Sequence, residues 1–175
     1  FTSDDWERFY EFSVTKLKKF PVPPELNPAP ARDLDALAQI LVTYEPSTLV
    51  HGVLPPTRQT LDEAHRAQEQ TRARMVALQE ELDWAIYGAY GLLTTDEVTR
   101  TTIPLHSGVE VPEILLGQRA FEIVLARKVV AGEAETGWFE RHGSAPITEI
   151  PDHWPDAYKK IVQARIDLIE ANKDI

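Results

Sequence analysis

The chain has 175 residues, enough to bury one ordinary core or two small ones without disulfide bonds. It contains no cysteine, which excludes a disulfide framework and a thiolate metal site, and it has no apolar run near the roughly 20 residues that cross a bilayer. A formal charge of −10 argues against strong nucleic-acid binding by the chain alone, because duplex affinity comes mostly from cationic side chains. The absence of cysteine fits a cytoplasmic location. We also expect a piece of a larger protein, since the sequence starts at Phe1 without methionine and stops at Ile175 inside a helical pattern.

The N-terminal region combines aromatic residues with a basic run and then prolines. Trp6, Phe9 and Tyr10 have helical spacing, whereas Phe12 and Val14 alternate as in an extended segment. The basic run follows as Lys16, Lys18 and Lys19. Prolines then recur between residues 21 and 30, and because proline lacks an amide donor and restricts its predecessor, we expect a rigid linker there.

A short helix and a long helix are predicted next. The pattern of leucines over residues 33–44 indicates an amphipathic helix that Pro46 ends. Residues 60–91 form one uninterrupted helical pattern, with Thr60 and Glu63 spaced as a capping box and Gly91 suited to the left-handed position after a helix. Such a helix is roughly 50 Å long, longer than a compact domain of this size is wide, so it is typical of a spacer.

One face of the long helix carries a seam with three- and four-residue spacing. The seam residues are Leu61, Ala64, Gln68, Thr71, Met75, Leu78, Leu82, Ala85, Ala89 and Leu92. Its first half is polar and its second half apolar, so we expect Leu78 and Leu82 to be buried and Gln68 to be solvated. The arginines of the first half indicate either a solvated face with intrahelical ion pairs or a spacer arm resting on a phosphate backbone.

The remainder of the chain also reads as helical. A turn is expected at residues 95–98 and a helix at residues 112–132, with Pro112 in its first turn and Gly132 after its end. In that helix we expect Leu116, Ala120, Ile123, Val124 and Val130 inward, and Arg119, Arg127 and Lys128 outward. A last helix begins near residues 152–155, with Trp154, Tyr158, Ile161, Val162, Ile166 and Ile169 on its apolar side. The fold class is therefore mainly α: one long spacer-like helix, shorter packed helices and proline-rich linkers.

Reactive constellations are not evident in the sequence. It shows no glycine-rich phosphate loop, no Asn-Pro-Pro-Tyr type motif for amino methylation, no metal-spaced histidines and no nucleophile near a base. The five histidines are scattered and are best explained as solvated. Trp84 and Tyr87 follow Leu78 and Leu82 at helical spacing, which favours a core role over base stacking. We assign no catalytic, cofactor-binding or metal-binding residue.

Four sequence segments together resemble one protein family. They are FYEFSVTKLKKFPVPPEL from Phe9, RMVALQEELDWAIYGAYGL from Arg74, LGQRAFEIVLARKVVAGEAETGWFERHGSAPITEIP from Leu116 and HWPDAYKKIVQARIDLIE from His153. They resemble the C-terminal portion of the large adenine-specific DNA methyltransferases of bacteriophage exclusion (BREX) defence systems, which are similar to type IIG restriction-methyltransferases. The proline-rich exit at Phe20 also resembles the end of a recognition domain in type I specificity subunits, where a long spacer helix follows.

This resemblance implies a division of labour within a parent enzyme. An upstream domain would bind S-adenosylmethionine and methylate N6 of a flipped adenine, while this region holds no cofactor and no catalytic residue. Residues 1–30 would form the end of a target-recognition-like region and its linker, residues 31–92 the short helix and the spacer helix, and residues 93–175 a C-terminal helical region. The expected partners are the methyltransferase core of the same chain, DNA through the parent, and other defence proteins.

Two hypotheses about function remain open at this stage. In the first, the region positions DNA-recognition elements and touches phosphates through Lys16, Lys18, Lys19, Arg66, Arg72 and Arg74. In the second, its acidic helical surface recruits another defence protein and never meets DNA. A contiguous basic stripe would favour the first hypothesis, because phosphate binding needs local positive charge despite the net charge of −10.

Overall fold

The computed structural model describes residues 14–23, 26–51, 55–103 and 108–172, and all regular structure within them is helical. The elements are α1 (Val14–Lys18), α2 (Ala29–Thr43), α3 (Pro46–Val50), α4 (Arg58–Ala89), α5 (Thr95–Thr101), α6 (Ala120–Val130), α7 (Trp138–His142) and α8 (Asp156–Ala171). The predicted mainly α class is confirmed. No described helix is long and apolar enough to cross a membrane.

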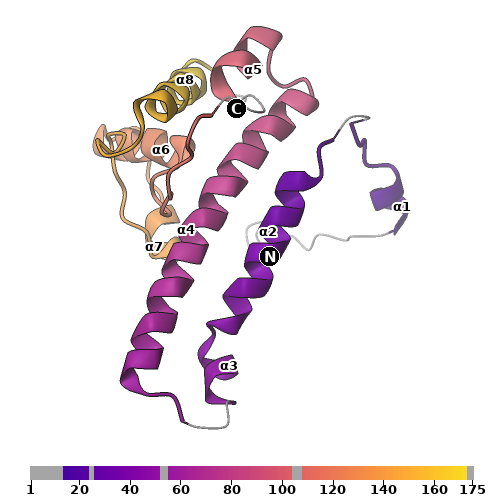
Figure 1. Cartoon of the computed structure of the whole chain (residues 1–175). Coiled ribbons are helices and arrows are strands. Elements are labelled where there is room, and N and C mark those ends of the chain that lie inside the picture. Colours follow the sequence, from indigo (N-terminus) through magenta and orange to yellow (C-terminus); the bar gives the residue numbers. More distant parts are fainter. Residues whose placement is uncertain (1–13, 24–25, 52–54, 104–107, 173–175) are drawn as a thin grey trace, which may run out of the picture.

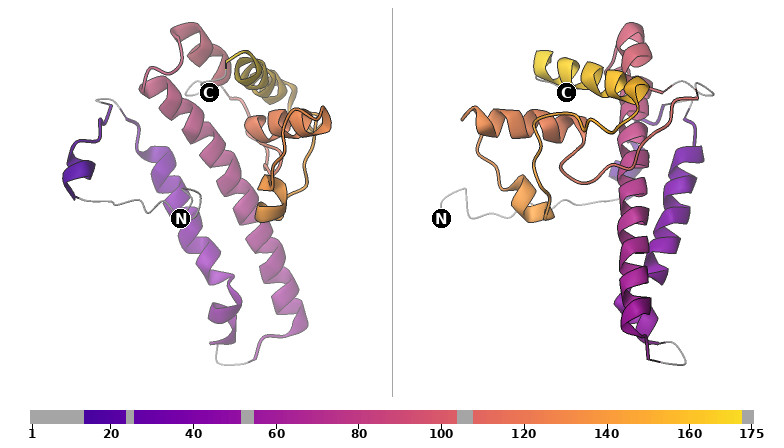
Figure 2. Two further views of the ribbon diagram at one scale, coloured as in Figure 1. Left: turned by 180° about the vertical axis from the view of Figure 1, so that it is seen from behind. Right: turned by 60° about the vertical axis from the view of Figure 1, so that its left-hand side comes forward.

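The long helix α4 organises the molecule into two parts (Figure 1). We call α2, α3 and residues 58–74 of α4 the stem, and residues 75–89 of α4 with α5 to α8 the head. In the stem, α2 descends beside the ascending α4 as an antiparallel pair. In the head, α5, α6 and α8 gather on the other side of α4, and the stem projects away from them (Figure 2). The predicted spacer-like helix therefore joins two different packing environments.

Local interactions determine where α4 begins and where it ends. The helix begins at Arg58, because the Thr57 side chain accepts the Thr60 amide hydrogen bond at 3.2 Å. The predicted capping box of Thr60 and Glu63 is therefore wrong: an equally suitable threonine lies three residues earlier. At the other end the prediction is confirmed, since Gly91 takes a left-handed φ of 68°. The Gly91 and Leu92 amides donate back to the carbonyls of Gly88 and Tyr87, both at 3.0 Å.

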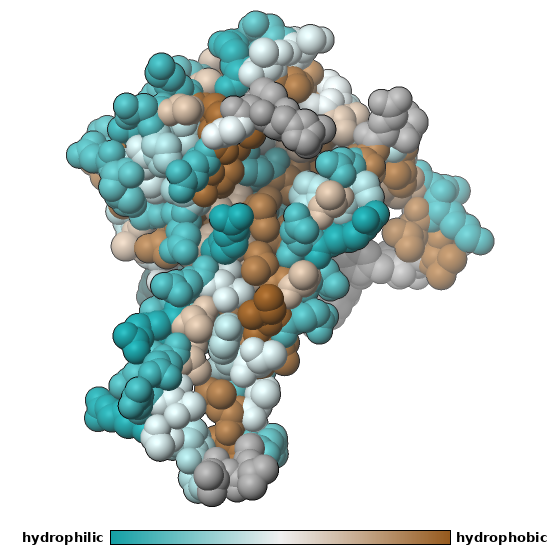
Figure 3. All heavy atoms as spheres, viewed as in Figure 1, coloured by the Kyte–Doolittle hydropathy of each residue, from teal (hydrophilic) through white to brown (hydrophobic). Residues whose placement is uncertain are grey.

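The two faces of α4 are buried to different extents. Ala73, Ala77, Glu80 and Trp84 recur every three or four residues and are fully buried on the side of the head. The seam lies on the opposite side of the helix, along α2, where Figure 3 shows apolar surface between the two helices. Leu78 and Leu82 are only half-buried, and so is Gln68. The predicted contrast between a buried and a solvated half of the seam is therefore wrong, because α2 covers both halves partly.

The core of the head combines α4, α6, α8 and the segment before α6. Its buried members are Ala77, Ile114, Ala120, Ile123, Val124, Trp154, Tyr158, Val162 and Ile166. The prediction of an apolar side of the last helix is confirmed by its buried members Tyr158, Val162 and Ile166. At about 25 cal/mol per Å² of buried apolar area, side chains of this kind supply most of the stabilisation of the head.

Several predicted boundaries differ from the structure. Only residues 120–130 of the predicted 112–132 helix are helical, because Gly117 has a φ of 97° and interrupts the chain before the N-cap Arg119. Val130, predicted inward, is 78% exposed. The expected turn at residues 95–98 is the start of helix α5, capped reciprocally by Thr94 and Glu97.

The N-terminal segment and α2 differ as well. Residues 14–18 are helical where an extended segment was expected, and the helix predicted around Trp6 to Tyr10 lies outside the described residues. Helix α2 begins at Ala29, four residues before the predicted start at Asp33, because the Asn27 side chain accepts the Ala29 amide at 3.0 Å and Pro30 is tolerated in the first turn.

Candidate functional site

The predicted basic residues fall into two separate groups. Lys16 and Lys18 lie in α1, and Lys19 follows it, with Lys18 and Lys19 exposed. This arm is tied to the C-terminal end of α4, where the Tyr90 hydroxyl donates to the Pro21 carbonyl at 2.8 Å. Arg66 lies 24 residues before Tyr90, which corresponds to about 36 Å along the helix. The structure therefore does not combine the lysines and the arginines into one surface.

The three candidate arginines are exposed, but they point in different directions from the stem. Because successive residues of an α-helix are about 100° apart, Arg74 lies roughly 80° from Arg66, and Arg72 lies roughly 120° from Arg66 on the other side. The Arg66 Nε donates to the Asp62 carbonyl at 3.2 Å. Acidic residues lie between the arginines, and His65 and Glu69 approach to 3.5 Å. The stem thus offers separate positive charges rather than one basic stripe.

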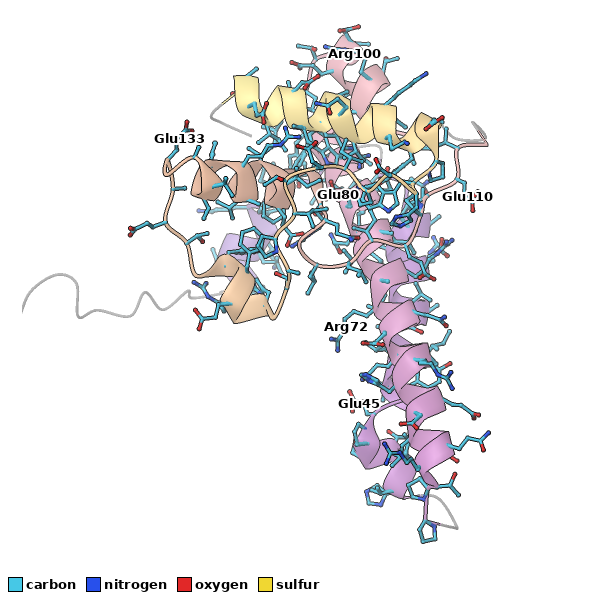
Figure 4. All side chains as sticks on the ribbon, turned by 90° about the vertical axis from the view of Figure 1, so that its left-hand side faces the viewer. Glu45, Arg72, Glu80, Arg100, Glu110 and Glu133 are labelled. Atoms are coloured by element: carbon cyan, nitrogen blue, oxygen red, sulfur yellow. The ribbon has the colours of Figure 1, made fainter. Side chains whose placement is uncertain are left out.

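Arg72 lines a groove of 480 Å³ between α4 and the head. In Figure 4 its side chain projects from α4 just below the head. The groove walls are residues 69–76 of α4, the segment 113–118 and the loop after α7 at residues 142–147. Glu69 and Glu113 also lie in this wall, so the arginine is accompanied by negative charge. This mixed lining makes Arg72 a different kind of candidate from Arg66 and Arg74.

A buried ion pair joins the last helix to the long helix. Arg165 of α8 is fully buried, and its Nη1 and Nη2 donate to Glu81 of α4 at 2.8 and 2.7 Å. Its Nε donates to the Thr101 carbonyl of α5 at 2.8 Å, and the Tyr158 hydroxyl donates to Glu81 at 2.7 Å. Burial opposes the charge of Arg165, but the hydrogen bonds and charge of Glu81 outweigh it and raise the pKa of the guanidinium. Three helices are therefore held by one guanidinium.

Glu80, the neighbour of Glu81, is buried in a less favourable environment. It is 4% exposed, and its Oε1 accepts from Trp84 Nε1 at 3.1 Å and from the Ala120 amide at 3.4 Å. Arg165 is 3.7 Å away. Burial raises the pKa of Glu80 above its ordinary value, and Arg165 and Trp84 offset this only in part. Figure 4 shows Glu80 where α4 enters the head.

A second buried carboxylate organises the segment before α6. Glu122 accepts hydrogen bonds from the amides of Gly117 and Arg119 at 2.7 and 3.1 Å. The Arg119 guanidinium donates to it at 3.1 and 2.9 Å, and Trp138 Nε1 of α7 donates at 3.1 Å. The outward position predicted for Arg119 is wrong, because its side chain is only 16% exposed and is held by Glu122. Glu122 thereby connects α6 to α7.

Sequence reasoning missed these buried charged residues. A signal was present in each case, because Arg165 falls among Tyr158, Val162 and Ile166 on the apolar side of its helix. Glu122 likewise follows Ala120 and precedes Ile123. A charged residue within an apolar stripe is rarely buried without a partner, so each position predicts a buried pair whose partner the sequence does not identify. Among the described residues, no group of acidic residues and histidines is arranged to hold a metal ion.

Comparison with known proteins assigns the chain to a family. A family model described as a domain of unknown function, DUF7008, matches residues 75–175, more than half of the sequence. The chain belongs to this family. The match begins within α4, close to where the head starts, so the DUF7008 region corresponds to the head and the stem precedes it.

The chain is also similar to part of an adenine-specific methyltransferase. It is 48% identical over 170 residues to the adenine-specific methyltransferase PglX of Streptomyces coelicolor, an alignment that covers 97% of this chain and 14% of PglX. The resemblance to an adenine-specific methyltransferase is thereby confirmed, and the chain spans about a seventh of that relative's length. No solved structure matches the chain.

Proposed function

We propose that this chain is the helical C-terminal spacer region of an adenine-specific DNA methyltransferase of phage defence, where it positions DNA-recognition elements and takes no part in catalysis. The similarity to PglX over 97% of the chain carries this proposal. The parent enzyme works in the cytoplasm and uses S-adenosylmethionine, which is bound by parts of the parent outside these residues.

The geometry supports a positioning role. The 32 residues of α4 extend over about 48 Å, and α2 stiffens the stem from one side. At the head, Arg165 joins α4, α5 and α8 through short, charge-assisted hydrogen bonds. A rod that is stiff along its length and locked at one end keeps a fixed distance and direction between the elements attached to it. In this proposal Lys16, Lys18, Lys19, Arg66, Arg72 and Arg74 are the candidates for phosphate contact.

Cofactor binding and methyl transfer test the proposal. The 175-residue chain alone should show no binding of S-adenosylmethionine by calorimetry. In the full-length methyltransferase, Glu81→Ala removes the partner of Arg165 and should weaken the contact between α4 and α8. We expect unchanged S-adenosylmethionine affinity and a fall in methyl transfer to the specific duplex, with Glu133→Ala in the exposed segment after α6 as the control. Micromolar binding of the cofactor by the isolated chain contradicts the non-catalytic assignment.

One observation favours a second candidate, a protein-interaction module that recruits other defence proteins. The arm of residues 14–22 exposes Val14, Leu17, Phe20 and Val22, with exposed fractions between 59% and 74%. Apolar side chains contribute little to phosphate binding, whereas protein interfaces use them. In the full-length protein, Leu17→Asp should abolish phage resistance while methylation stays intact if this candidate holds. Loss of both activities together supports the positioning role instead.

A further inference from the structure

One face of α4 carries two acidic and two aromatic residues at a helical repeat. Glu80, Asp83, Trp84 and Tyr87 stand at positions i, i+3, i+4 and i+7, so they share one face of the helix. Together with Phe121 of α6 and Ile169 of α8, they line a cavity of 280 Å³. Pockets for drug-sized ligands usually measure about 300 to 1,000 Å³, so this cavity suits a single side chain or a small group.

The carboxylates of this cavity have unused acceptor capacity. Every hydrogen bond that Glu80 accepts from the described residues ends on Oε1, although the residue is only 4% exposed. Asp83 accepts from Gln79 Nε2 through Oδ1, at 2.6 Å. Glu80 Oε2 and Asp83 Oδ2 thus receive no hydrogen bond from the described part of the chain. Trp154 Nε1 is the only completely buried side-chain polar atom of the described residues that has no partner, so neither of these oxygens is fully enclosed, and both can accept a hydrogen bond from a group that enters the cavity.

The two nearby guanidinium groups have closer partners than Glu80 and Asp83, although both also act on these carboxylates at longer range. The guanidinium of Arg165 is engaged bidentately by Glu81, and that of Arg119 by Glu122. The approach of Arg165 to Glu80 is longer, at 3.7 Å. The pKa of Tyr87 is raised by burial and by the charges of Asp83 and Glu80, which outweigh the opposing charge of Arg119. Glu80 and Asp83 are therefore the carboxylates of this group that no arginine engages bidentately.

The aromatic rings add a second attraction for cations. Trp84 and Tyr87 meet edge to face with ring centroids 5.6 Å apart. Two of these rings already attract guanidinium groups, since Arg165 Cζ lies 5.2 Å from the Trp84 ring and Arg119 Cζ lies 4.6 Å from the Phe121 ring. The negative face of an aromatic ring attracts a cation, most strongly where water is excluded.

We propose that this cavity binds one organic cation, the guanidinium or ammonium group at the end of an alkyl chain, as in arginine or lysine. Asp83 and Glu80 supply the counter-charge and accept its hydrogen bonds, and Trp84, Tyr87 and Phe121 surround it. The site lies in the head and on the opposite face of α4 from α2, and the assignment does not depend on any role in DNA methylation.

Nuclear magnetic resonance of the 175-residue chain tests the site. The indole N–H of Trp84, one of four tryptophans, donates to Glu80 and reports directly on the cavity. Titration with Nα-acetyl-arginine amide should shift this resonance with saturation, whereas Nα-acetyl-citrulline amide, which is neutral and nearly the same shape, should bind at least tenfold more weakly. Equal affinity for the two probes overturns the proposal.

Variants and a second probe complete the experiment. Asp83→Asn and Tyr87→Leu should each weaken binding of Nα-acetyl-arginine amide at least fivefold, and the exposed Glu133→Gln should leave it unchanged. Affinities of both variants within twofold of the parent chain overturn the proposal, provided that circular dichroism shows the same helix content. Butylguanidine distinguishes two sources of the cation: weaker binding than the capped amino acid assigns a peptide side chain, and equal binding assigns a free alkylguanidine, either of which supports the site.

Discussion

Arg165 and Glu81 are 84 positions apart in sequence, yet they form a bidentate ion pair with N···O distances of 2.8 and 2.7 Å. The arginine side chain is fully buried, and that of Glu81 is 16% exposed. The pair links the last helix to the long helix, and the Nε bond to Thr101 adds α5. Burying two charges costs solvation energy, so this contact stabilises the fold only while both partners and their hydrogen bonds are present.

Removing one partner of this pair is the first prediction. Arg165→Met keeps much of the side-chain volume but leaves Glu81 and Glu80 without a counter-charge, so unfolding free energy should fall by about 3 to 5 kcal/mol. The control is Arg100→Met, which breaks the exposed pair with Asp96 on α5 and should cost about 1 kcal/mol or less. Urea denaturation followed by circular dichroism measures both. Equal losses for the two variants contradict the central role of Arg165.

The pH dependence of stability provides the second prediction, because two buried carboxylates act with opposite signs. Burial alone opposes ionisation of Glu122, but hydrogen bonds from Arg119 and Trp138 and the charge of Arg119 hold its pKa below the ordinary value. Its contribution is therefore present above the unfolded pKa of about 4.3 and lost as the pH falls through the lower folded pKa. Glu122→Gln should destabilise the chain most near pH 7 and progressively less in acid.

Glu80 should behave in the opposite way. Burial raises its pKa, so its contribution is complete below about pH 4.3 and is lost as the pH rises through the higher folded pKa. The stability difference between Glu80→Gln and the parent chain should thus shift in favour of the variant as the pH rises. Urea unfolding between about pH 3.5 and 8 measures both slopes, with Glu140→Gln on the exposed side of α7 as the control. Slopes of the same sign for Glu80 and Glu122 refute the assignment.

Gly117 is the subject of the third prediction. Its φ is 97°, and a Cβ at this position would lie 2.3 Å from the Ala145 carbonyl oxygen. Gly117→Ala should therefore be more destabilising than the roughly 1 to 2 kcal/mol expected for a left-handed alanine alone. Gly132→Ala is the matched control, because φ is 73° and a Cβ would meet nothing within 4 Å. Thermal unfolding of the two variants measures the difference, and equal costs would mean that the loop beside Gly117 yields freely.

The sequence predicted the helical class and the end of α4 well, because these depend on local signals such as helical spacing and Gly91. It placed the start of α4 wrongly, since Thr57 and Thr60 are equivalent as local signals and only the folded chain chooses between them. It also extended α6 backwards, because the turn at Gly117 is held by Glu122, a residue whose burial depends on α7.

For the candidate site, the sequence predicted that two aromatic residues pack, but it did not predict the cavity that they form with other helices. Trp84 and Tyr87 were correctly expected to pack, yet their neighbours Glu80 and Asp83 read as ordinary polar positions on a long helix. Their environment is created by Phe121 and Ile169, which arrive from other helices. The partner of Arg165 was equally hidden, because pairing over 84 positions follows from how α8 crosses α4 and not from spacing along either helix.

The last prediction concerns DNA and the two exposed arginines of the stem. If Arg66 and Arg74 contact phosphates in the parent methyltransferase, replacing each with alanine should weaken binding to specific and non-specific duplexes alike. The slope of log K against log salt concentration should decrease by about 0.9 per lost contact, because each arginine releases condensed counterions. Folding should be nearly unchanged, since exposed charges contribute little to stability.

Arg72 gives this experiment an internal comparison. It points into the groove beside Glu69 and Glu113, where nearby carboxylates repel a phosphate, so Arg72→Ala should change the salt slope less than Arg66→Ala or Arg74→Ala. Fluorescence anisotropy with labelled duplexes between about 50 and 200 mM salt measures all three slopes. Three unchanged slopes with methylation intact would leave the stem arginines as a solvated face, and the exposed apolar arm around Leu17 would then be the surface through which this region acts.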